Sequence, residues 1–491
     1  MTGTENTLRA GDGQPLFTLR QVAENSGGRI LAGRPEAILT GVAVDTRAVQ
    51  SGDLFCAIRG ERVDAHGLIP LAVRAGASGI LVDRDPPDRY RLTDVPSGVG
   101  VVRVGSVPVA LGRLARWHLE QHHPALSVFA VTGSVGKTSA CRLLAAALGA
   151  AGAAVLTPEG SFNTDISLPL VCLRARAHHR YAALELGMRG PGQIRYLAEI
   201  CRPRTALLTL IGRSHLEQLG SIEAIVRAKG ELVAAIPAEG TVVLNRDDPR
   251  QHALAETARG RVLWYGVKES AVDLRAVDLA AEEDGAWRFR AQVAGSGAGP
   301  TVRLRLVGRH QVANALGALA CAYAEGIDLA AAAERQGRVA PAAGRLNVRT
   351  CGAIQIVDDT YNASPDSVSA ALAVLRSLCP QAEDRALILG DMRELGSDSG
   401  NLHRLVGEEV AAMGVRWLVT VGTDAQRAAE GARRAGLDAQ RVRMVSDSAQ
   451  ARMVIGELLT AGLTVLVKGS RAVGLESVVD EIAEWAARRD A

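Results

Sequence analysis

A short apolar strand, a glycine-rich turn and a helix follow one another near residue 130, and this unit constrains the fold most. Ser127–Val131 is apolar, residues 132–139 read TGSVGKTS, and helical periodicity begins at Lys137. Glycines let backbone N–H groups approach an anion, and the N-terminus of the following helix favours negative charge there. The sequence therefore predicts a phosphate-binding loop after a strand of a parallel sheet.

The loop departs from the common pattern GxxxxGK[ST], because Val131 stands at the first glycine position. The strand before it and the helix after it still supply the context that the pattern requires. We expect Lys137 to reach the β- and γ-phosphates of ATP and the Thr138 hydroxyl to ligate Mg²⁺. The alternative is a glycine-rich turn with a solvated lysine. The residues expected to cradle the phosphates are Gly133, Ser134, Val135, Gly136, Lys137, Thr138 and Ser139.

Strand and helix patterns alternate along the chain, which predicts an α/β fold of about three domains. Residues 1–16 hold little apolar material and are expected to form a disordered leader. Residues 17–107 predict a small α/β domain, and 108–338 predict the domain of the phosphate loop, with a parallel sheet and an antiparallel hairpin at 268–306. Residues 339–491 repeat the α/β pattern.

Composition excludes several classes of protein. A net charge of +3 gives no support for binding nucleic acid or membranes. The seven cysteines form no CxxC pair, which disfavours a zinc site or a disulfide framework and indicates a reducing compartment. No apolar run reaches the roughly 18 residues that span a bilayer, and the polar N-terminus lacks a signal sequence. We expect a cytoplasmic monomer that binds neither nucleic acid nor membranes.

Further motifs resemble the Mur ligases, in which the loop takes the form TGSVGKTS. VAVDTRAVQSGDLFCAIRGERVDAH resembles their first domain, which binds the UDP-linked precursor. The central ATPase domain of the family is similar to the stretches ALELGMRGPGQI, LIGRSHLEQLGS, RAKGEL and VLNRDDP. The C-terminal domain of the family is similar to DDTYNASP, LGDMRELG and VKGSRAVGLE. The resemblance covers about residues 17–485. It implies a three-domain Mur ligase architecture, with a central P-loop ATPase sheet and a Rossmann-like C-terminal domain.

Within this family, DDTYNASP followed by LGDMRELG is similar to the members that add D-alanyl-D-alanine, and no DNPR-type stretch is present. The resemblance implies an ATP-dependent amide ligase that joins D-alanyl-D-alanine to UDP-N-acetylmuramoyl tripeptide through an acyl phosphate, in peptidoglycan precursor synthesis. ATP and two Mg²⁺ ions are the implied cofactors. Two alternatives stay open: a paralogous ligase with another amine or acceptor, and a P-loop ATPase that acts as a switch or binding protein.

The resemblance also implies metal ligands. Glu185 ends a strand beside the loop, where a carboxylate can hold Mg²⁺ together with Thr138. His215 would help to bind a second Mg²⁺, and Lys229 would be carbamylated, which turns a cation into a metal-binding carboxylate. Taken without the family, these two are an ordinary loop histidine and a solvated helix lysine. The implied catalytic set is Lys137, Lys229, His215 and Arg345.

Nucleotide contacts follow from the same resemblance. Asn314, in GRHQVANAL, would lie near the adenine, although Gln311 replaces the first asparagine of the family pattern HNxxN. Arg345 matches an arginine that binds phosphate, and Asp359 is similar to an aspartate that binds the ribose hydroxyls. Without the family, a hinge arginine and a strand-end carboxylate are the alternatives.

Substrate contacts are expected from three parts of the chain. The expected set is Thr46 and Arg47 at the uridine diphosphate, with Asn163, Tyr361 and Asn362 on the acceptor and amine side. Two motifs depart from the family: SFNTDISLP has Thr164 and Ser167 in place of Asn and Gly, and YNASP has Ser364 in place of Asn. These departures bear on substrate specificity more than on the chemistry of ATP.

Overall fold

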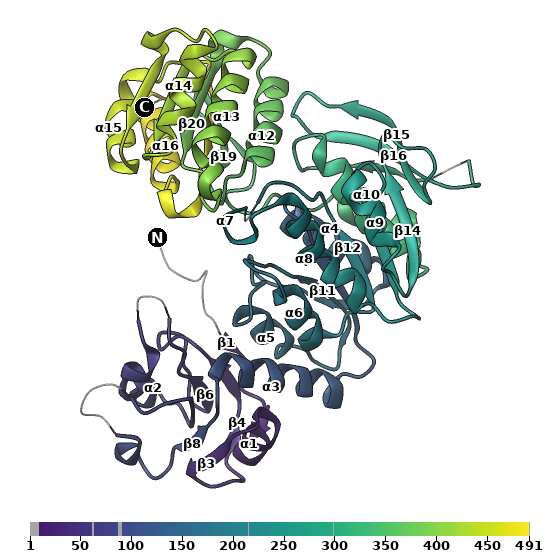
Figure 1. Cartoon of the computed structure of the whole chain (residues 1–491), viewed down its shortest axis with the longest axis vertical. Coiled ribbons are helices and arrows are strands. Elements are labelled where there is room, and N and C mark those ends of the chain that lie inside the picture. The colour runs from purple at the N-terminus through teal and green to yellow at the C-terminus, as the bar shows by residue number, and fades with distance from the viewer. Residues whose placement is uncertain (1–8, 61–62, 87–90, 215, 298, 491) are drawn as a thin grey trace.

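The chain folds into three domains that follow one another along the sequence, each built on its own sheet (Figure 1). The computed structural model describes residues 9–60, 63–86, 91–214, 216–297 and 299–490. The first and third domains lie at the two ends of the molecule, and the second lies between them. The expected three-domain α/β architecture is confirmed. Among the described helices, none has the length and apolar character needed to cross a bilayer.

The first domain contains a six-stranded sheet in the order β1-β5-β6-β7-β8-β3. Its central strands are buried on both faces, which explains their almost wholly apolar sequences. The strands are β1 (Arg9–Ala10), β3 (Arg29–Ala32), β5 (Gly41–Ala43), β6 (Asp53–Cys56), β7 (Gly79–Val82) and β8 (Gly100–Arg103), with β2 (Phe17–Thr18) and β4 (Ile38–Leu39) as a separate pair, and the helices are α1 (Leu19–Ser26) and α2 (Ile69–Arg74).

Strand β1 corrects the expectation of a disordered leader over residues 1–16. Arg9 and Ala10 pair antiparallel with β5, and Ala10 is buried. The Arg9 guanidinium makes an ion pair with the buried carboxylate of Asp53 at 2.7 Å, and Arg174 of the second domain donates to the Arg9 carbonyl at 3.0 Å. The leader prediction is therefore wrong for this strand, and residues 1–8 lie outside the described residues.

Helix α3 (Val107–His122) joins the first domain to the second. It packs against α1 on one side and against α5 (Ser167–Cys172) and α6 (Gln193–Cys201) on the other. The apolar cores of the two domains are continuous through this helix. The connection is thus a packed element and not a free linker.

The second domain contains a nine-stranded sheet in the order β10-β11-β9-β12-β13-β14-β15-β16-β17. Strands β10 to β15 are parallel, and β15, β16 and β17 form antiparallel hairpins, as expected. The strands are β9 (Ser127–Thr132), β10 (Ala154–Leu156), β11 (His179–Glu185), β12 (Thr205–Leu208), β13 (Thr241–Asn245), β14 (Arg261–Gly266), β15 (Leu274–Ala281), β16 (Trp287–Val293) and β17 (Thr301–Arg303).

Helices cover both faces of this sheet, because alternate strand residues point to opposite sides. Val128 and Ala130 of β9 belong to a core with α5, α6 and α8 (Ile222–Ala235). Phe129 and Val131 belong to a core with α4 (Lys137–Leu148), α10 (His310–Ala324) and α11 (Leu329–Gln336). The carboxyl end of β9 therefore emerges between two packed layers.

The third domain has a six-stranded sheet in the order β18-β19-β23-β20-β21-β22, parallel except for β18, with a helical layer on each face. This is the expected Rossmann-like arrangement. The strands are β18 (Asn347–Cys351), β19 (Ile354–Asp359), β20 (Arg385–Gly390), β21 (Trp417–Val421), β22 (Val442–Val445) and β23 (Thr464–Lys468), and the helices are α12 (Pro365–Leu378), α13 (Ser399–Met413), α14 (Gln426–Arg434), α15 (Ser448–Leu458) and α16 (Glu476–Asp490).

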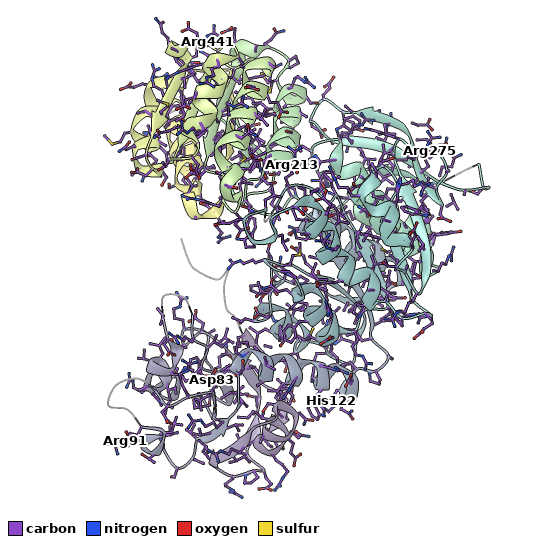
Figure 2. All side chains as sticks on the ribbon, in the orientation of Figure 1. Asp83, Arg91, His122, Arg213, Arg275 and Arg441 are labelled. Carbon is purple, nitrogen blue, oxygen red and sulfur yellow. The ribbon has the colours of Figure 1, made fainter. Side chains whose placement is uncertain are left out.

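Contacts between the second and third domains include two that backbone N–H groups of the second domain make. The backbone N–H of Arg213, which Figure 2 shows at their junction, donates to the Asp366 carboxylate at 2.7 Å. The backbone N–H of Glu217, in α7 (Leu216–Leu219), donates to the carbonyl of Glu394 at 3.2 Å. These contacts place the carboxyl ends of both parallel sheets near one another.

Helix α13 packs closely on α14 at Gly407. A Cβ atom at Gly407 would lie 1.9 Å from the carbonyl oxygen of Ala428, whereas nothing lies within 4 Å of a Cβ at Gly400 in the same helix. Gly407→Ala should therefore lower the free energy of unfolding of the third domain by about 1–3 kcal/mol. Gly400→Ala should leave that free energy unchanged or raise it, because alanine favours helix. Hydrogen exchange of the α13 and α14 amides measures both, and equal protection in the two variants would contradict the packing argument.

Candidate active site

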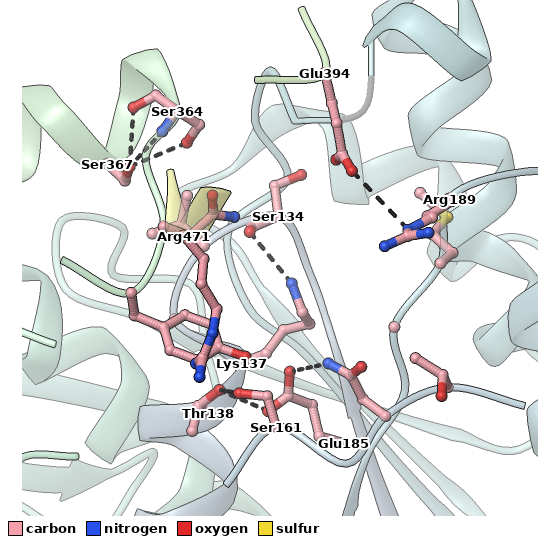
Figure 3. A pocket seen from close by; sticks show the side chains of 18 of the residues that line it. Ser134, Lys137, Thr138, Ser161, Glu185, Arg189, Ser364, Ser367, Glu394 and Arg471 are labelled. Carbon is pink, nitrogen blue, oxygen red and sulfur yellow. Dashed lines mark hydrogen bonds and ion pairs between the residues drawn. The ribbon is translucent and has the colours of Figure 1, made fainter. Parts of the chain in front are cut away.

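A cavity of about 1110 Å³ lies between the second and third domains (Figure 3). The second domain lines it with the phosphate loop and with residues that follow β11. The third domain contributes Arg345, Tyr361, Lys468 and Arg471. The cavity is large enough for a nucleotide together with a second ligand, since single-ligand pockets usually measure about 300–1,000 Å³.

The phosphate loop connects β9 to α4, as the sequence predicted. Gly133 has a φ of +152° and Gly136 has a φ of +89°, which favours glycine at both positions. A Cβ at Gly133 would lie 1.9 Å from Oγ1 of Thr209, and one at Gly136 would lie 2.6 Å from Oδ1 of Asn314. Both glycines are thus needed for conformation and for space.

Two lysines from different helices donate to one carbonyl oxygen of this loop. Nζ of Lys137, the first residue of α4, lies 2.9 Å from the carbonyl oxygen of Gly133, and Nζ of Lys229 in α8 lies 2.8 Å from the same atom. Lys229 is only 1% exposed, so it is not a solvated helix lysine. Burial, together with the charge of Lys137, holds the pKa of Lys229 well below its ordinary value. Burial also lowers the pKa of Lys137.

A buried carboxylate faces the first turn of α4. Glu185, at the end of β11, accepts a hydrogen bond from the Thr138 hydroxyl at 2.7 Å and another from the Asn163 side-chain amide at 2.7 Å. Glu185 is 1% exposed. These hydroxyl and carboxylate oxygens are the ligand types that Mg²⁺ prefers. His215, the other expected metal ligand, lies outside the described residues.

A chain of polar side chains borders the loop where the adenine is expected. The amide nitrogen of Gln311 lies 3.1 Å from Nε2 of His310, and its oxygen accepts from Asn314 at 2.9 Å. Burial lowers the pKa of His310 to about 4, so the ring is neutral and its Nε2 accepts. Asn314 packs on Gly136. Gln311, longer than the asparagine of the family pattern, thus bridges the two neighbours.

Arg345 crosses from the third domain toward the second. Its Nη2 donates to the Ser161 hydroxyl at 3.0 Å, and its Cζ lies 4.0 Å from the centre of the Tyr361 ring. The guanidinium of Arg471 lies 5.3 Å from the centre of the same ring. Cation–π contacts of this kind hold both cations in the cavity without neutralising them.

Asp359 makes an ion pair with Lys468, a residue for which no role was expected from the sequence. Nζ of Lys468, at the end of β23, lies 2.5 Å from Asp359 Oδ2 and 2.9 Å from the Asn362 carbonyl oxygen. The other Asp359 oxygen accepts from the backbone N–H of Leu346 at 3.2 Å. Asp359 and Asn362 line the cavity as expected, and Lys468 orients both.

Lysine content is the signal that could have identified Lys468. The sequence contains four lysines, and the other basic residues are arginines. Lys137, Lys229 and Lys468 line the cavity, while Lys268 is exposed on the surface. In an arginine-rich chain, a retained lysine marks a position that requires a compact ammonium group and not a planar guanidinium.

Two further charged residues of the cavity were missed. Arg189 and Glu394 approach each other across the domain junction at 4.0 Å (Figure 3). Glu394 has a φ of +65°, which is uncommon for a residue other than glycine and marks local strain. Hydrophobic periodicity in the sequence indicates neither this ion pair nor the positive φ of Glu394.

The departures from the family motifs have a local structural account. Ser364 is the N-cap of α12, and it exchanges hydrogen bonds with Ser367. Thr164 and Ser167 likewise bond to each other ahead of α5, at 3.0 Å between the hydroxyls. Serine caps helices about as well as asparagine does, so Ser364 keeps the start of α12 in place.

Thr46 and Arg47 lie after β5 in the first domain and are not among the residues that line the cavity. The Arg47 side chain is 85% exposed and pairs with Asp45 at 2.5 Å. That contact lowers the pKa of Asp45. The structure therefore brings together the expected residues of the second and third domains that it describes, and it leaves these two apart.

Known proteins resemble the chain over most of its length. Residues 131–322 match the Mur ligase middle domain, and residues 344–471 match the Mur ligase glutamate ligase domain. The chain is 32% identical to the UDP-N-acetylmuramoyl-tripeptide–D-alanyl-D-alanine ligase of Escherichia coli, over 95% of this chain and 98% of the relative. It is 34% identical to the Mycobacterium bovis ligase of the same name, over 95% and 97%.

Solved structures give the same result. MurF from Acinetobacter baumannii superposes with a TM-score of 0.83 at 29% identity, covering 96% of this chain and 99% of that one. MurF from Thermotoga maritima, in complex with ADP, superposes with a TM-score of 0.76 at 26% identity, covering 91% and 98%. The chain therefore belongs to the Mur ligase family.

Proposed function

We propose that the chain is an ATP-dependent ligase that joins D-alanyl-D-alanine to UDP-N-acetylmuramoyl tripeptide. The observation that carries this proposal is the single cavity in which the phosphate loop faces Arg345, Tyr361 and Lys468 of the third domain. Relatives that span nearly the whole chain are ligases named for this reaction, and one solved relative holds ADP. Nucleotide binding would use the phosphate loop of the second domain, and amide formation would take place between this loop and the third domain.

ATP would lie along the loop with its phosphates on the backbone N–H groups that begin α4. Lys137 now donates to two loop carbonyls, at 2.9 and 3.3 Å, and anionic phosphate oxygens are stronger partners for an ammonium group. Arg345 would add a second cation on the opposite wall. The neutral His310 and the amides of Gln311 and Asn314 would border the adenine.

The reaction needs activation, because amide formation from a carboxylate and an amine is unfavourable in water. The acceptor carboxylate would displace ADP from the γ-phosphorus of ATP and form an acyl phosphate. The free amine of D-alanyl-D-alanine would then attack the carbonyl carbon, lose a proton and expel inorganic phosphate. Lys137 and Arg345 would screen the repulsion between the carboxylate and the phosphates.

Magnesium fits the oxygen ligands of this site. Thr138 and Glu185 would hold one ion, and a carbamylated Lys229 would serve a second ion together with His215. Bound Mg²⁺ would neutralise charge on the phosphates. Carbamylation requires a neutral amine, and the lowered pKa of the buried Lys229 favours that form.

Dependence on substrates tests the proposal directly. Phosphate release from ATP should require both UDP-N-acetylmuramoyl tripeptide and D-alanyl-D-alanine, with one amide formed for each phosphate. A coupled phosphate assay with single omissions, and mass spectrometry of the product, measure this. Equal ATP turnover without the acceptor would instead indicate a P-loop ATPase, and turnover with a different amine would indicate a paralogous ligase.

Lys229 and Lys137 should respond differently to short carboxylic acids. Lys229→Ala and Lys137→Ala should each lower the ligation rate by about a hundredfold or more, because each removes a charge-bearing group of the site. Acetate or propionate should restore Lys229→Ala about tenfold, since a carboxylate replaces the lost carbamate ligand. The same acids should not restore Lys137→Ala, whose role requires a cation.

Lys268→Ala is the matched control for both variants, because Lys268 is exposed and remote from the cavity. It should retain full activity. Full activity in Lys229→Ala would remove that residue from the site. Equal rescue of the Lys137 variant would show that the acids act elsewhere.

We propose that Thr46 and Arg47 bind the uridine diphosphate of the acceptor. The exposed Arg47 guanidinium can give a diphosphate two hydrogen bonds in place of those to Asp45. Arg47→Ala should raise the KM for the acceptor about tenfold and leave the KM for ATP unchanged. Arg34→Ala, at another exposed arginine of this domain, is the control. An unchanged acceptor KM in Arg47→Ala would exclude this role.

A further inference from the structure

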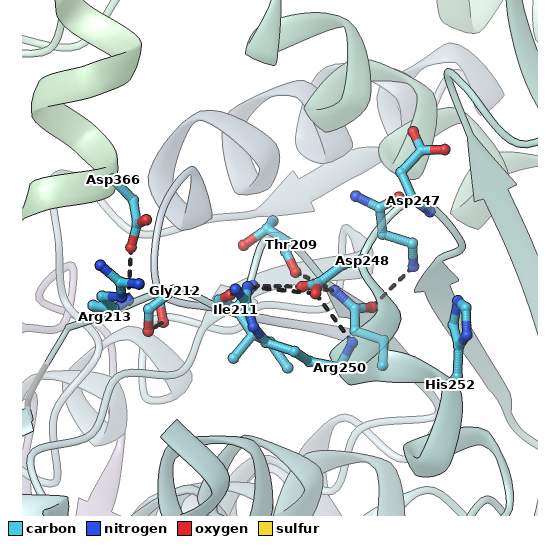
Figure 4. A network of polar contacts seen from close by, with 12 residues as sticks. Thr209, Ile211, Gly212, Arg213, Asp247, Asp248, Arg250, His252 and Asp366 are labelled. Atoms are coloured by element: carbon cyan, nitrogen blue, oxygen red, sulfur yellow. Dashed lines mark hydrogen bonds and ion pairs between the residues drawn. The ribbon is translucent and has the colours of Figure 1, made fainter. Parts of the chain in front are cut away.

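The segment 209–213, which follows β12, supports the phosphate loop from one side (Figure 4). The carbonyl oxygen of Leu210 accepts from the Ser134 backbone N–H at 2.7 Å, and the carbonyl oxygen of Gly212 accepts from the Ser134 hydroxyl at 2.9 Å. Thr209 Oγ1 lies 2.8 Å from the carbonyl oxygen of Val135, to which it donates. Any movement of this segment therefore moves the loop.

The buried carboxylate of Asp248 holds the same segment in place. Asp248, whose side chain is 1% exposed, accepts from the Ile211 backbone N–H at 2.9 Å. The side-chain amide of Gln251 donates to the Thr209 carbonyl at 2.6 Å, and Arg250 donates to the Ile211 carbonyl. These contacts, seen together in Figure 4, make the segment a rigid connection and not a free loop.

The third domain reaches this segment through the side chain of Asp366. Asp366, the second residue of α12, accepts from the Arg213 backbone N–H at 2.7 Å. A Cβ atom at Gly212 would lie 2.4 Å from the same Asp366 oxygen. Gly212 does not have the left-handed backbone that favours glycine. The close approach of Asp366 is thus the reason that no side chain fits at this position.

We propose that Asp366 is a positioning residue that couples the placement of the third domain to the geometry of the phosphate loop. This inference rests on the proposed function, in which the loop binds ATP. Asp366 acts through Arg213 and Gly212, and the Gly212 carbonyl oxygen accepts directly from the Ser134 hydroxyl. Arg345 of the third domain also donates to Ser161, whose hydroxyl lies 3.5 Å from that of Thr138, and Glu217 donates to Glu394 away from the loop. Asp366 differs from these residues because it contacts the segment whose carbonyl groups accept from Ser134 of the loop.

The coupling has a clear physical basis. A carboxylate that accepts a backbone N–H makes a stronger hydrogen bond than a neutral acceptor does. Interfaces between domains of one chain permit relative motion by default. With Asp366 in place, the arrangement that brings Arg345 to the cavity also holds the segment against the loop. Without it, the position of the third domain would no longer act on the loop through Arg213 and Gly212.

The test compares Asp366→Ala and Asp366→Asn with the parent. Affinity for a non-hydrolysable ATP analogue with Mg²⁺ is measured by calorimetry, and affinity for the UDP-linked acceptor is measured separately. Asp366→Ala should weaken nucleotide binding about tenfold, the worth of one charge-assisted hydrogen bond. It should leave acceptor affinity within about twofold, because the first domain does not touch this contact. Asp366→Asn should keep most of the nucleotide affinity, since its amide oxygen still accepts from Arg213.

Gly212→Ala tests the contact with Asp366 from the second domain. Its new methyl group should displace Asp366 and weaken nucleotide binding by about tenfold or more. In the double variant Gly212→Ala/Asp366→Ala the carboxylate is gone and the methyl group has space. The double variant should therefore bind nucleotide as Asp366→Ala does, and the two losses should not multiply.

Parent-like nucleotide affinity in Asp366→Ala, or losses that multiply in the double variant, would overturn the inference. A loss in Asp366→Asn equal to that in Asp366→Ala would overturn it too, because the carboxylate would then act by charge and not by this contact. The proposed function fails separately, if the parent binds no nucleotide or needs no acceptor for turnover. Nucleotide affinity tests Asp366 whichever amine or acceptor the enzyme uses.

Discussion

The carbonyl oxygen of Gly133 is the atom on which the organisation of the site depends. Lys137 and Lys229 both donate to it, so two ammonium groups from different helices lie close together in a buried place. Burial lowers the pKa of each lysine, and the like charge of Lys137 lowers the pKa of Lys229 further. Added negative charge relieves the repulsion between the two ammonium groups, so the phosphate loop is prepared for an anion before any ligand binds.

The remaining polar groups of the cavity complement this charge. Glu185 faces the loop from β11, and Asp359 faces it from β19 with Lys468 as its partner. Each carboxylate is held by at least two donors, so its position is set before a ligand arrives. Preorganised charge of this kind needs no rearrangement during a reaction. The third domain supplies half of it, and contacts between domains therefore decide whether the site is complete.

Local patterns were sufficient for much of the fold and part of the site. Apolar runs followed by TGSVGKTS predicted the strand, loop and helix, because hydrophobic periodicity and glycine act over a few residues. The end of β11 likewise located Glu185. Strand β1 was missed, because two residues have no periodicity and their partner Asp53 lies 44 residues away. Lys468 was missed because it orients Asp359 across 109 residues of sequence.

The sequence by itself determined the order of the strands and helices, the place of the phosphate loop and the family to which the motifs belong. Only the tertiary structure decided that Lys137 and Lys229 share one acceptor and that Lys468 holds Asp359. It also decided that Asp366 meets Gly212, a contact between residues 154 positions apart in the chain. Short-range periodicity encodes where an element begins and ends. Distances between side chains of different elements depend on how whole layers pack, and no local pattern records that packing.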